Sequence, residues 1–338
     1  MLARSRQLVA AAIALGLILA SAVASAAGAT SRPGPVVFAP YLDMTLDPPP
    51  NLTAIHQASG VRQASLGFVT ARGGNACTPT WGGYASDPAG GAAAFERGSV
   101  AVFQRSGGSV VTSFGGQAGT ELASACRSIS TLKHAYASVV AAYHPTRVDF
   151  DVEGAAVSER AAITRRSQAI AALQHRFRRL RVSFTLPVLP TGLDPGALGV
   201  LRSAIAHHVK VTYVNVMTMD YGDAAAPDPA GKMGSYAIQS ARSVSRQLRS
   251  LYRHLSAKRR MRMLGVTPMI GINDTSDEVF TLSDAAQLAG FARSQHLGML
   301  GFWSVNRDHQ CPQAAIQAED SCSGLAQSDF QFARTFQK

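Results

Sequence analysis

Three carboxylates occupy alternate positions in an otherwise apolar stretch, Val148-Asp149-Phe150-Asp151-Val152-Glu153. Alternate residues of a β-strand lie on one face, about 7 Å apart, so we expect the three acids on one side and the apolar residues on the other. Like charges held together away from water cannot all ionise, so the pKa of at least one carboxyl should rise. A general acid that works near neutral pH needs such a raised pKa. The alternative is an edge strand with its acids in solvent.

Apolar runs rich in Val, Ile and Phe alternate along the chain with amphipathic stretches of helical spacing. Strands that alternate with helices pair in parallel through right-handed crossovers. Eight strands in a chain of 338 residues favour an α/β fold, a closed single-domain (β/α)8 TIM barrel. A doubly wound open sheet is the alternative, but it needs a Gly-rich turn after its first strand, where this chain has Tyr41-Leu42-Asp43. The expected strands are Val36–Tyr41, Ala64–Val69, Val110–Phe114, Arg147–Val152, Val182–Pro187, Tyr213–Met219, Met263–Met269 and Met299–Trp303.

Helices are expected between these strands. Ser283 or Asp284 is the expected N-cap of the helix that begins near Leu282, and the loop from Gly73 to Gly98 is long and Gly-rich. Catalytic groups of a barrel lie at the C-terminal ends of its strands, so Glu153 should stand at the mouth, with Asp151 and Asp149 successively deeper. The expected helices are Leu132–Tyr143, Glu159–Arg179, Tyr236–Leu255 and Leu282–His296, and the tail Ser328–Lys338 has the pattern of a last one.

Residues 1–29 have the pattern of a secretory signal peptide. Arg4 and Arg6 precede an apolar run that is followed by small residues, with cleavage expected near Ala26 or Ala29. The run is short for a membrane span. We therefore expect a secreted, extracellular protein without a membrane span, in which residues 30–338 form the barrel.

Secretion makes disulfides the first interpretation of the four cysteines. Four cysteines allow three pairings, of which we favour Cys77–Cys126 and Cys311–Cys322. Their spacings resemble no zinc module, so no metal is expected.

The net charge of +11 comes partly from runs of basic residues at Arg176–Arg181 and Arg253–Arg262. Such patches can contact nucleic acid. These runs have no interleaved aromatic residues and belong to no recognisable binding module. A solvated basic face is favoured, with no nucleic-acid partner.

Together these residues resemble glycoside hydrolase family 18, the chitinase family, over nearly the whole mature chain. The fourth-strand motif of that family, Asp-x-x-Asp-x-Asp-x-Glu, is matched by Asp149, Asp151 and Glu153, with Thr146 in place of the first Asp. Its third-strand Ser-x-Gly-Gly is matched by Ser113-Phe114-Gly115-Gly116, which should let the backbone pass close to the acidic strand.

The resemblance extends to the sixth and eighth strands. The sixth ends Met-x-Tyr-Asp in the family and Met217-Thr218-Met219-Asp220 here, followed by Tyr221, in a phrase that resembles a bacterial branch. The usual Tyr donates to the acetamido oxygen of the sugar, which Met219 cannot do. Tyr221 shares strand parity with Met219 and is a candidate replacement. Trp303 resembles the Trp that floors the family's sugar pocket, whereas Trp81 is either a second sugar platform or a loop anchor.

The resemblance implies a chitinase that cleaves β-1,4-linked N-acetylglucosamine polymers with retention and without a cofactor. Glu153 would act as general acid and base while the substrate's acetamido oxygen attacks its own anomeric carbon. Asp151 would hold the acetamido N–H, and Asp149 would share a proton with Asp151. The implied substrate-binding residues are Trp303, Asp220, Met217, Met219, Tyr221, Ser113, Gly115, Gly116 and Tyr41.

Two other functions stay open: a weakly active or inactive chitin-binding lectin, and an endo-β-N-acetylglucosaminidase that acts on N-glycans. The interval between Met269 and about Asp284 is too short for the α+β domain that many family members insert there, which predicts a more open cleft and endo-type cutting. Asn273, Asp274 and Glu278 in this interval either contact sugar or belong to a solvated loop. The protein is expected to be a monomer that binds chitin or another glycan containing N-acetylglucosamine.

Overall fold

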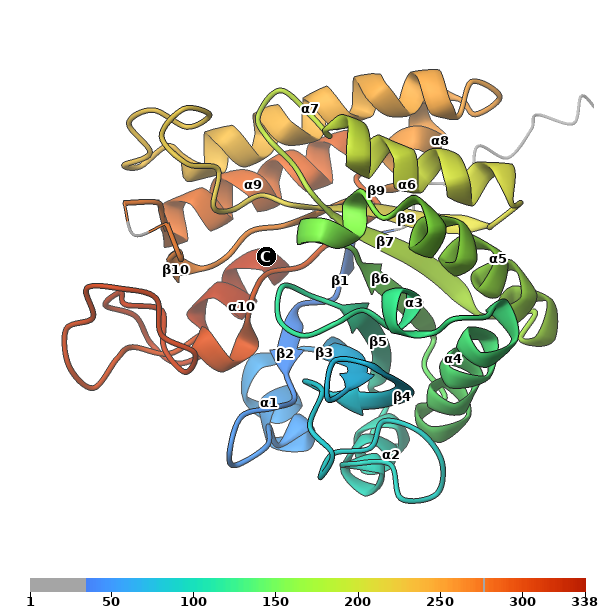
Figure 1. Ribbon diagram of the computed structural model, residues 1–338. Helices are drawn as coiled ribbons and strands as arrows, with labels where there is room; N and C mark the ends of the chain where they lie inside the picture. Colours follow the sequence, from blue (N-terminus) through green and yellow to red (C-terminus); the bar gives the residue numbers. More distant parts are fainter. Residues whose placement is uncertain (1–34, 276) are drawn as a thin grey trace, which may run out of the picture. The chain divides into compact units, whose positions relative to one another are not determined.

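Parallel strands form a barrel wall in residues 35–275 and 277–338, which are the residues that this computed structural model describes (Figure 1). The predicted signal peptide, residues 1–29, lies outside them. Each of the eight predicted strands overlaps a strand of the wall. The wall consists of β1 (Val37–Phe38), β2 (Tyr41–Asp43), β3 (Gln63–Arg72), β5 (Ser109–Gly115), β6 (Arg147–Asp151), β7 (Arg181–Pro187), β8 (Val211–Met217), β9 (Leu264–Thr267) and β12 (Met299–Leu300).

The first predicted strand closes the barrel because it is broken into β1 and β2. β1 pairs with β12, and β2 pairs with β3, so the two parts join the two edges of the sheet. The break falls at Ala39-Pro40, where proline cannot donate to a strand ladder. All neighbouring strands of the wall pair in parallel. The predicted closed (β/α)8 barrel is therefore confirmed.

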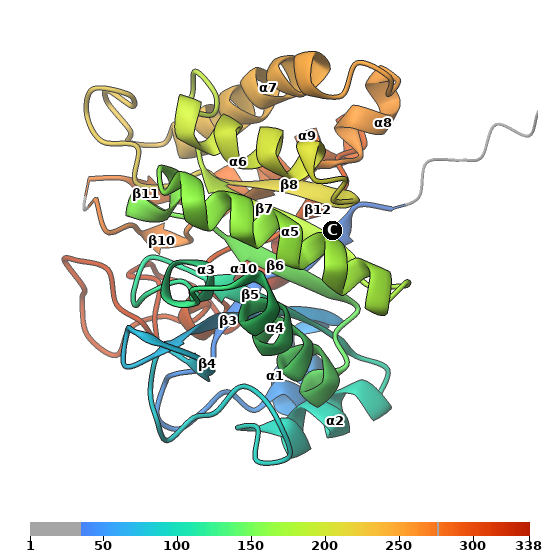
Figure 2. The ribbon, with the colours of Figure 1, turned by 45° about the vertical axis from the view of Figure 1, so that its right-hand side comes forward.

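Helices pack around the outside of the wall (Figures 1 and 2). The five predicted helices are all present, with ends that differ by a few residues. The α-helices are α1 (Leu52–Ser59), α2 (Arg97–Arg105), α3 (Leu122–Ala125), α4 (Ile129–Tyr143), α5 (Arg160–Arg176), α6 (Pro195–Ala206), α7 (Met233–Leu251), α8 (Ala257–Met261), α9 (Leu282–Gln295) and α10 (Gln331–Gln337), with short 3-10 turns η1 (Gly154–Val157) and η2 (Val305–Arg307).

The predicted N-cap of α9 was wrong. Thr281 caps this helix: its hydroxyl accepts a hydrogen bond from the Asp284 backbone N–H, and the Asp284 carboxylate accepts one from the Thr281 N–H. This reciprocal pair is a capping box, which satisfies two backbone donors that the helix itself cannot. Asp284 is therefore the third helical residue rather than the cap.

The loop predicted from Gly73 to Gly98 contains an additional strand, β4 (Ala76–Trp81), which pairs with β3 in antiparallel fashion. The indole of Trp81 is fully buried, and its Nε1 donates to the Tyr143 hydroxyl at 2.8 Å. Trp81 is thus a loop anchor and not a sugar platform. A disulfide from Cys77 to Cys126 ties β4 to the end of α3.

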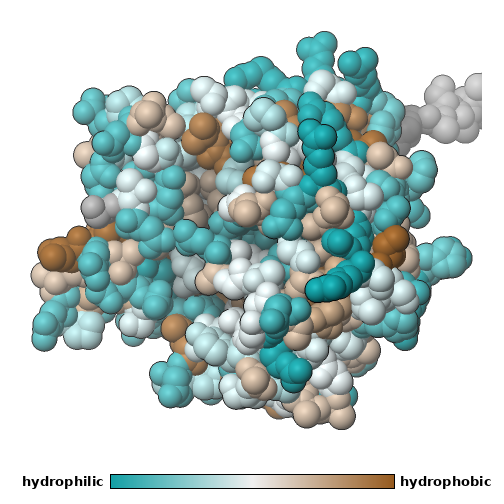
Figure 3. Space-filling model, in the orientation of Figure 1, coloured by the Kyte–Doolittle hydropathy of each residue, from teal (hydrophilic) through white to brown (hydrophobic). Residues whose placement is uncertain are grey.

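The interval between β9 and α9 forms a small antiparallel hairpin, β10 (Gly271–Ile272) with β11 (Val279–Phe280), and no separate domain appears in its described residues. The second disulfide, Cys311–Cys322, closes the loop that precedes α10, so both favoured pairings are present. No described helix has the length and apolar character to cross a membrane. On the face seen in Figure 3, hydrophobic side chains lie mostly singly among hydrophilic ones.

The two disulfides should differ in what they contribute to stability. They close loops with sequence separations of 49 and 11. In the chain-entropy description the longer loop corresponds to roughly 4 kcal/mol of unfolding free energy and the shorter to roughly 3 kcal/mol. We predict that the double variant Cys77→Ser/Cys126→Ser loses more stability in guanidinium unfolding than Cys311→Ser/Cys322→Ser. An equal or larger loss for the second pair would contradict this order.

Candidate active site

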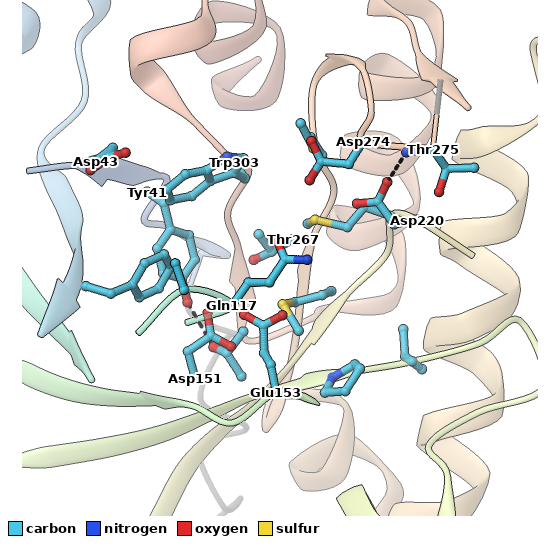
Figure 4. Close-up of a pocket in the computed structure, with 18 of the residues that line it drawn as sticks. Tyr41, Asp43, Gln117, Asp151, Glu153, Asp220, Thr267, Asp274, Thr275 and Trp303 are labelled. Atoms are coloured by element: carbon cyan, nitrogen blue, oxygen red, sulfur yellow. Dashed lines mark hydrogen bonds between the residues drawn. The ribbon is translucent and has the colours of Figure 1, made fainter. Parts of the chain in front are cut away.

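A pocket of about 810 Å³ opens at the C-terminal ends of the wall strands, where the active sites of such barrels lie (Figure 4). Several wall strands and the loops that follow them contribute to it. Its polar lining is dominated by carboxylates and hydroxyls, and its apolar lining by aromatic rings and methionines. The lining residues are Tyr41, Asp43, Thr45, Phe68, Thr70, Gly82, Gln117, Ala118, Asp151, Glu153, Thr185, Pro187, Val188, Leu189, Asp194, Met217, Met219, Asp220, Thr267, Met269, Asp274, Thr275, Trp303 and Asp320.

The three acids of β6 form successive layers, as their spacing predicts. Glu153 lies just beyond the strand and is half-buried, whereas Asp151 and Asp149 are 3% and 2% exposed. Asp151 and Glu153 line the pocket, and Asp149 lies below it. The intervening Val148, Phe150 and Val152 are fully buried on the other face, where Phe150 stacks on Phe114 with ring centroids 5.4 Å apart.

Four hydroxyl groups surround the Asp149 carboxylate. Oδ2 accepts from Tyr41, Ser113 and Thr185 at 3.0, 2.8 and 2.9 Å. Oδ1 accepts from Ser183 at 2.5 Å. These donors stabilise a carboxylate that is buried from water. No hydrogen bond joins Asp149 to Asp151 in the described part of the chain, so Asp149 influences Asp151 through its charge.

Burial raises the pKa of Asp151 and that of Glu153. The pKa of Asp151 lies well above its ordinary value because of burial, with further contributions from the charges of Glu153 and Asp149. The pKa of Glu153 is raised to about 7, mainly by burial and also by the charge of Asp220, while a hydrogen bond with Asp151 opposes the rise. The predicted rise is confirmed. Since the two carboxyls interact, the protonation of one changes the pKa of the other.

Two glycines let β5 approach the acidic strand. Gly115 has φ of 105°, and a Cβ there would lie 1.9 Å from the Asp151 carbonyl oxygen. Gly116 has φ of 85° and donates its N–H to that same oxygen at 3.1 Å. Both conformations favour glycine. Ser113, Gly115 and Gly116 lie outside the pocket lining, so they support the acids rather than contact a ligand.

Aromatic rings form one wall of the pocket. Trp303 and Phe68 are stacked, with centroids 5.4 Å apart and planes at 20°. Tyr41 lies against both rings. Such a surface can pack against the apolar face of a pyranose. Sequence reasoning identified Trp303 and Tyr41 but missed Phe68, which reads as one more apolar residue of a buried strand.

The end of β8 and the residues after it bring Met217, Met219 and Asp220 into the pocket lining but not Tyr221. Tyr221 is 7% exposed, and its hydroxyl lies 3.1 Å from that of Ser240 on α7. The parity argument for Tyr221 failed because β8 ends at Met217 and Asp220 has φ of 49°. This left-handed residue turns the chain and ends the alternation of a strand.

The end of β2 and the loops supply lining residues that no motif indicated, among them Asp43, Gln117, Asp194 and Asp320. Of the three undecided residues in the β9–α9 interval, only Asp274 lines the pocket. Asn273 is buried and donates to the Met269 carbonyl at 2.9 Å. Glu278 is also buried and accepts from the Gly222 N–H at 2.7 Å, so these two brace the loops.

Comparison with known proteins finds relatives that are described as chitinases. No family model matches the chain. A protein described as a probable bifunctional chitinase/lysozyme, from Escherichia coli strain K12, is 36% identical over 280 residues. Endochitinase 11 of Metarhizium anisopliae is 35% identical over 283 residues. Each alignment covers 80% of this chain, but it spans only 31% of the first protein and 52% of the second.

Among solved structures, active domain 2 of the Pyrococcus furiosus chitinase, in complex with chito-oligosaccharides, matches with a TM-score of 0.78. It is 31% identical, and the match covers 89% of this chain and 93% of that one. Relatives in three different organisms do not assign the chain to a bacterial branch, which stays a prediction.

The close approach of β5 to β6 can be tested at Gly115. We predict that Gly115→Ala destabilises the protein more than Gly107→Ala, because both glycines have positive φ but a Cβ at Gly107 meets nothing within 4 Å. The control variant carries only the backbone penalty, on the order of 1 kcal/mol. Urea unfolding of both variants measures the difference, and equal losses would show that Asp151 tolerates the added methyl group.

Proposed function

This chain belongs to the chitinases of glycoside hydrolase family 18, and on that basis we propose that it hydrolyses β-1,4-linked N-acetylglucosamine polymers. The observation that supports this most is the coupled pair Asp151 and Glu153, held in a pocket beside the aromatic surface of Trp303. Because the chain spans a minor part of one relative and about half of the other, the activity rests on the site itself.

In the proposed reaction Glu153 protonates the glycosidic oxygen as the bond to the anomeric carbon breaks. A pKa of about 7 leaves a large fraction of Glu153 protonated near neutral pH. The acetamido oxygen of the substrate forms the new bond to the anomeric carbon and gives an oxazolinium ion. Glu153, now a carboxylate, then takes a proton from the water that opens this ring.

In this proposal Asp151 orients the acetamido group. Its Oδ1 is buried and has no hydrogen-bond partner within the described residues, so an acetamido N–H would satisfy it. Asp151 and Glu153 also project from the same face of one segment. A water on the opposite side of the sugar would need a base on that side, which this pair does not supply. The placement therefore favours retention of configuration.

Met219 leaves the acetamido oxygen without the donor that the family usually provides, and Tyr221 cannot replace it from its buried position. Gln117 is the donor that we assign instead. It lines the same pocket as Glu153 (Figure 4), and it makes no side-chain hydrogen bond within the described residues. A lectin-like protein with little turnover is the second candidate, and the missing Tyr is the observation that favours it.

Secretion belongs to the same proposal. The pattern of residues 1–29 and the two disulfides support an extracellular protein. The short β10–β11 hairpin, in place of an inserted domain, supports an open cleft and endo-type cutting. Product ratios that are exo-like from the first minutes would contradict that cleavage mode.

Replacing the proposed acid should remove turnover but keep binding. We predict that Glu153→Gln lowers the rate of release from fluorogenic chitobiose or chitotriose glycosides by at least roughly a hundredfold, the usual contribution of a general acid. Glu159→Gln, which changes a Glu outside the pocket lining, is the matched control. Activity that survives in the first variant would exclude Glu153 as the acid, and binding without turnover in the wild type would favour the lectin.

The pH dependence should report the raised pKa of Glu153. Because the protonated form acts first, kcat/KM should fall as the pH rises through about 7. The charge of Asp220 raises this pKa, so Asp220→Asn should move the alkaline limb to lower pH. Asp228→Asn, an exposed change outside the pocket lining, should leave it in place. A limb that stays fixed or moves upward in Asp220→Asn would contradict the assignment.

A further inference from the structure

The pocket lining is rich in acidic residues although the chain as a whole is basic. The formal net charge of the chain is +11, with 21 acidic residues in total. A third of those acids line this one pocket, and no Lys, Arg or His lines it within the described residues. The seven are Asp43, Asp151, Glu153, Asp194, Asp220, Asp274 and Asp320.

The protein does not neutralise these charges by ion pairing. None of the salt bridges found among residues 35–275 and 277–338 includes a pocket acid. The hydrogen bonds that Asp43, Asp194 and Asp220 accept come from uncharged donors, including the backbone N–H groups of Thr45, Ala197 and Thr275. Uncharged donors stabilise the carboxylates but leave their charge in place.

One guanidinium group lies behind three of the pocket acids. Arg307 is 1% exposed and donates to the backbone carbonyls of Ile270, Ile272 and Glu319, so it joins the loops from inside. Its charge interacts with Asp220, Asp274 and Asp320. A single positive charge against these three carboxylates leaves that side of the pocket negative.

The acids are spread along the cleft. Asp43 lies on one side of Trp303, and Asp220 and Asp274 lie on the other (Figure 4). Asp194 precedes α6, and Asp320 belongs to the loop closed by the second disulfide. Acids on separate elements around one cleft suit a polymeric ligand with several positive charges better than a single ion.

Two buried oxygens in the pocket lining indicate that the ligand is also polar. Asp151 Oδ1 and Thr70 Oγ1 have no hydrogen-bond partner within the described residues, and the two side chains are 3% and 1% exposed. A buried polar atom without a partner is costly. Both residues line the pocket, and a ligand with N–H or O–H groups is one source of the missing partners.

We propose that the preferred substrate is partly deacetylated chitin, with N-acetylglucosamine at the cleaved position and protonated glucosamine at flanking positions. This inference rests on the proposed function. The cleaved unit must keep its acetamido group because that group is the nucleophile. The ammonium groups at C2 of the flanking sugars donate charge-assisted hydrogen bonds to the pocket carboxylates. A reaction that hydrolyses the amide bonds of chitin must therefore supply the substrate.

Hydrolysis and binding are both measured, so the inference can be tested even without turnover. Wild-type kcat/KM is compared for fully acetylated oligosaccharides and for partly deacetylated ones of equal length, at mildly acidic pH. Calorimetry with Glu153→Gln gives the two affinities. We expect the partly deacetylated ligand to be favoured roughly three- to tenfold in both measurements at low salt, the size expected for a few partly exposed charge pairs. Salt should reduce this preference, since the screening length falls to about 10 Å at 0.1 M.

The role of the pocket carboxylates is tested with the double variant Asp274→Asn/Asp320→Asn, called the rim variant. Asp228→Asn is the control that removes an acid outside the pocket lining. The preference ratio should fall in the rim variant and persist in the control, whatever happens to the overall rate. Equal or weaker binding of the partly deacetylated ligand, or a ratio unaffected by salt and by the rim variant, would overturn the inference. If neither ligand is cleaved but the preference in binding holds, the proposed hydrolase fails and the inferred selectivity stands.

Discussion

The site depends on keeping three carboxylates of one strand inside a closed barrel. Burial of a carboxylate is costly unless hydrogen bonds or charges compensate it. Here the compensation comes from neighbouring strands whose register fixes it: Asp149 lies beside Ser113 of β5 and beside Ser183 of β7. Below this layer Arg147 is buried, with its guanidinium 5.0 Å from the centroid of the Tyr213 ring. The interior thus carries a basic layer, then a hydroxyl-bound carboxylate, and then the two acids that face the pocket.

The same alternation that places the acids inside places an aromatic cluster outside. Phe150 lies between Phe114 and Phe184 and meets the edge of Tyr136 on α4. These contacts hold β6 against its neighbours and against the outer helices. A change in strand register would move every acid to the apolar face, because side chains alternate with a period of two. The hydrophobic packing therefore fixes the position of the acidic face.

Sequence patterns predicted the strands and the acid layers because both follow from local alternation. They also indicated the main helices, both disulfides and Trp303. They failed where a single backbone conformation ends a pattern, as at Asp220, where positive φ removed Tyr221 from the pocket. They also could not assign Asp43 at the end of β2, or loop residues such as Gln117 and Asp320, because long-range folding alone brings these to one cleft. The N-cap of α9 was misassigned because three chemically suitable caps, Thr281, Ser283 and Asp284, lie within four positions of the sequence.

The central claim is that Asp151 and Glu153 act from one side of the scissile bond while the substrate supplies its own nucleophile. Proton NMR of the first sugar products from a soluble N-acetylated chitin oligosaccharide tests this most directly, before the anomers equilibrate. The account predicts that the new reducing end appears first as the β-anomer. An α-anomer at the earliest times would require a water activated from the opposite face, and it would contradict the proposal that the substrate supplies its own nucleophile.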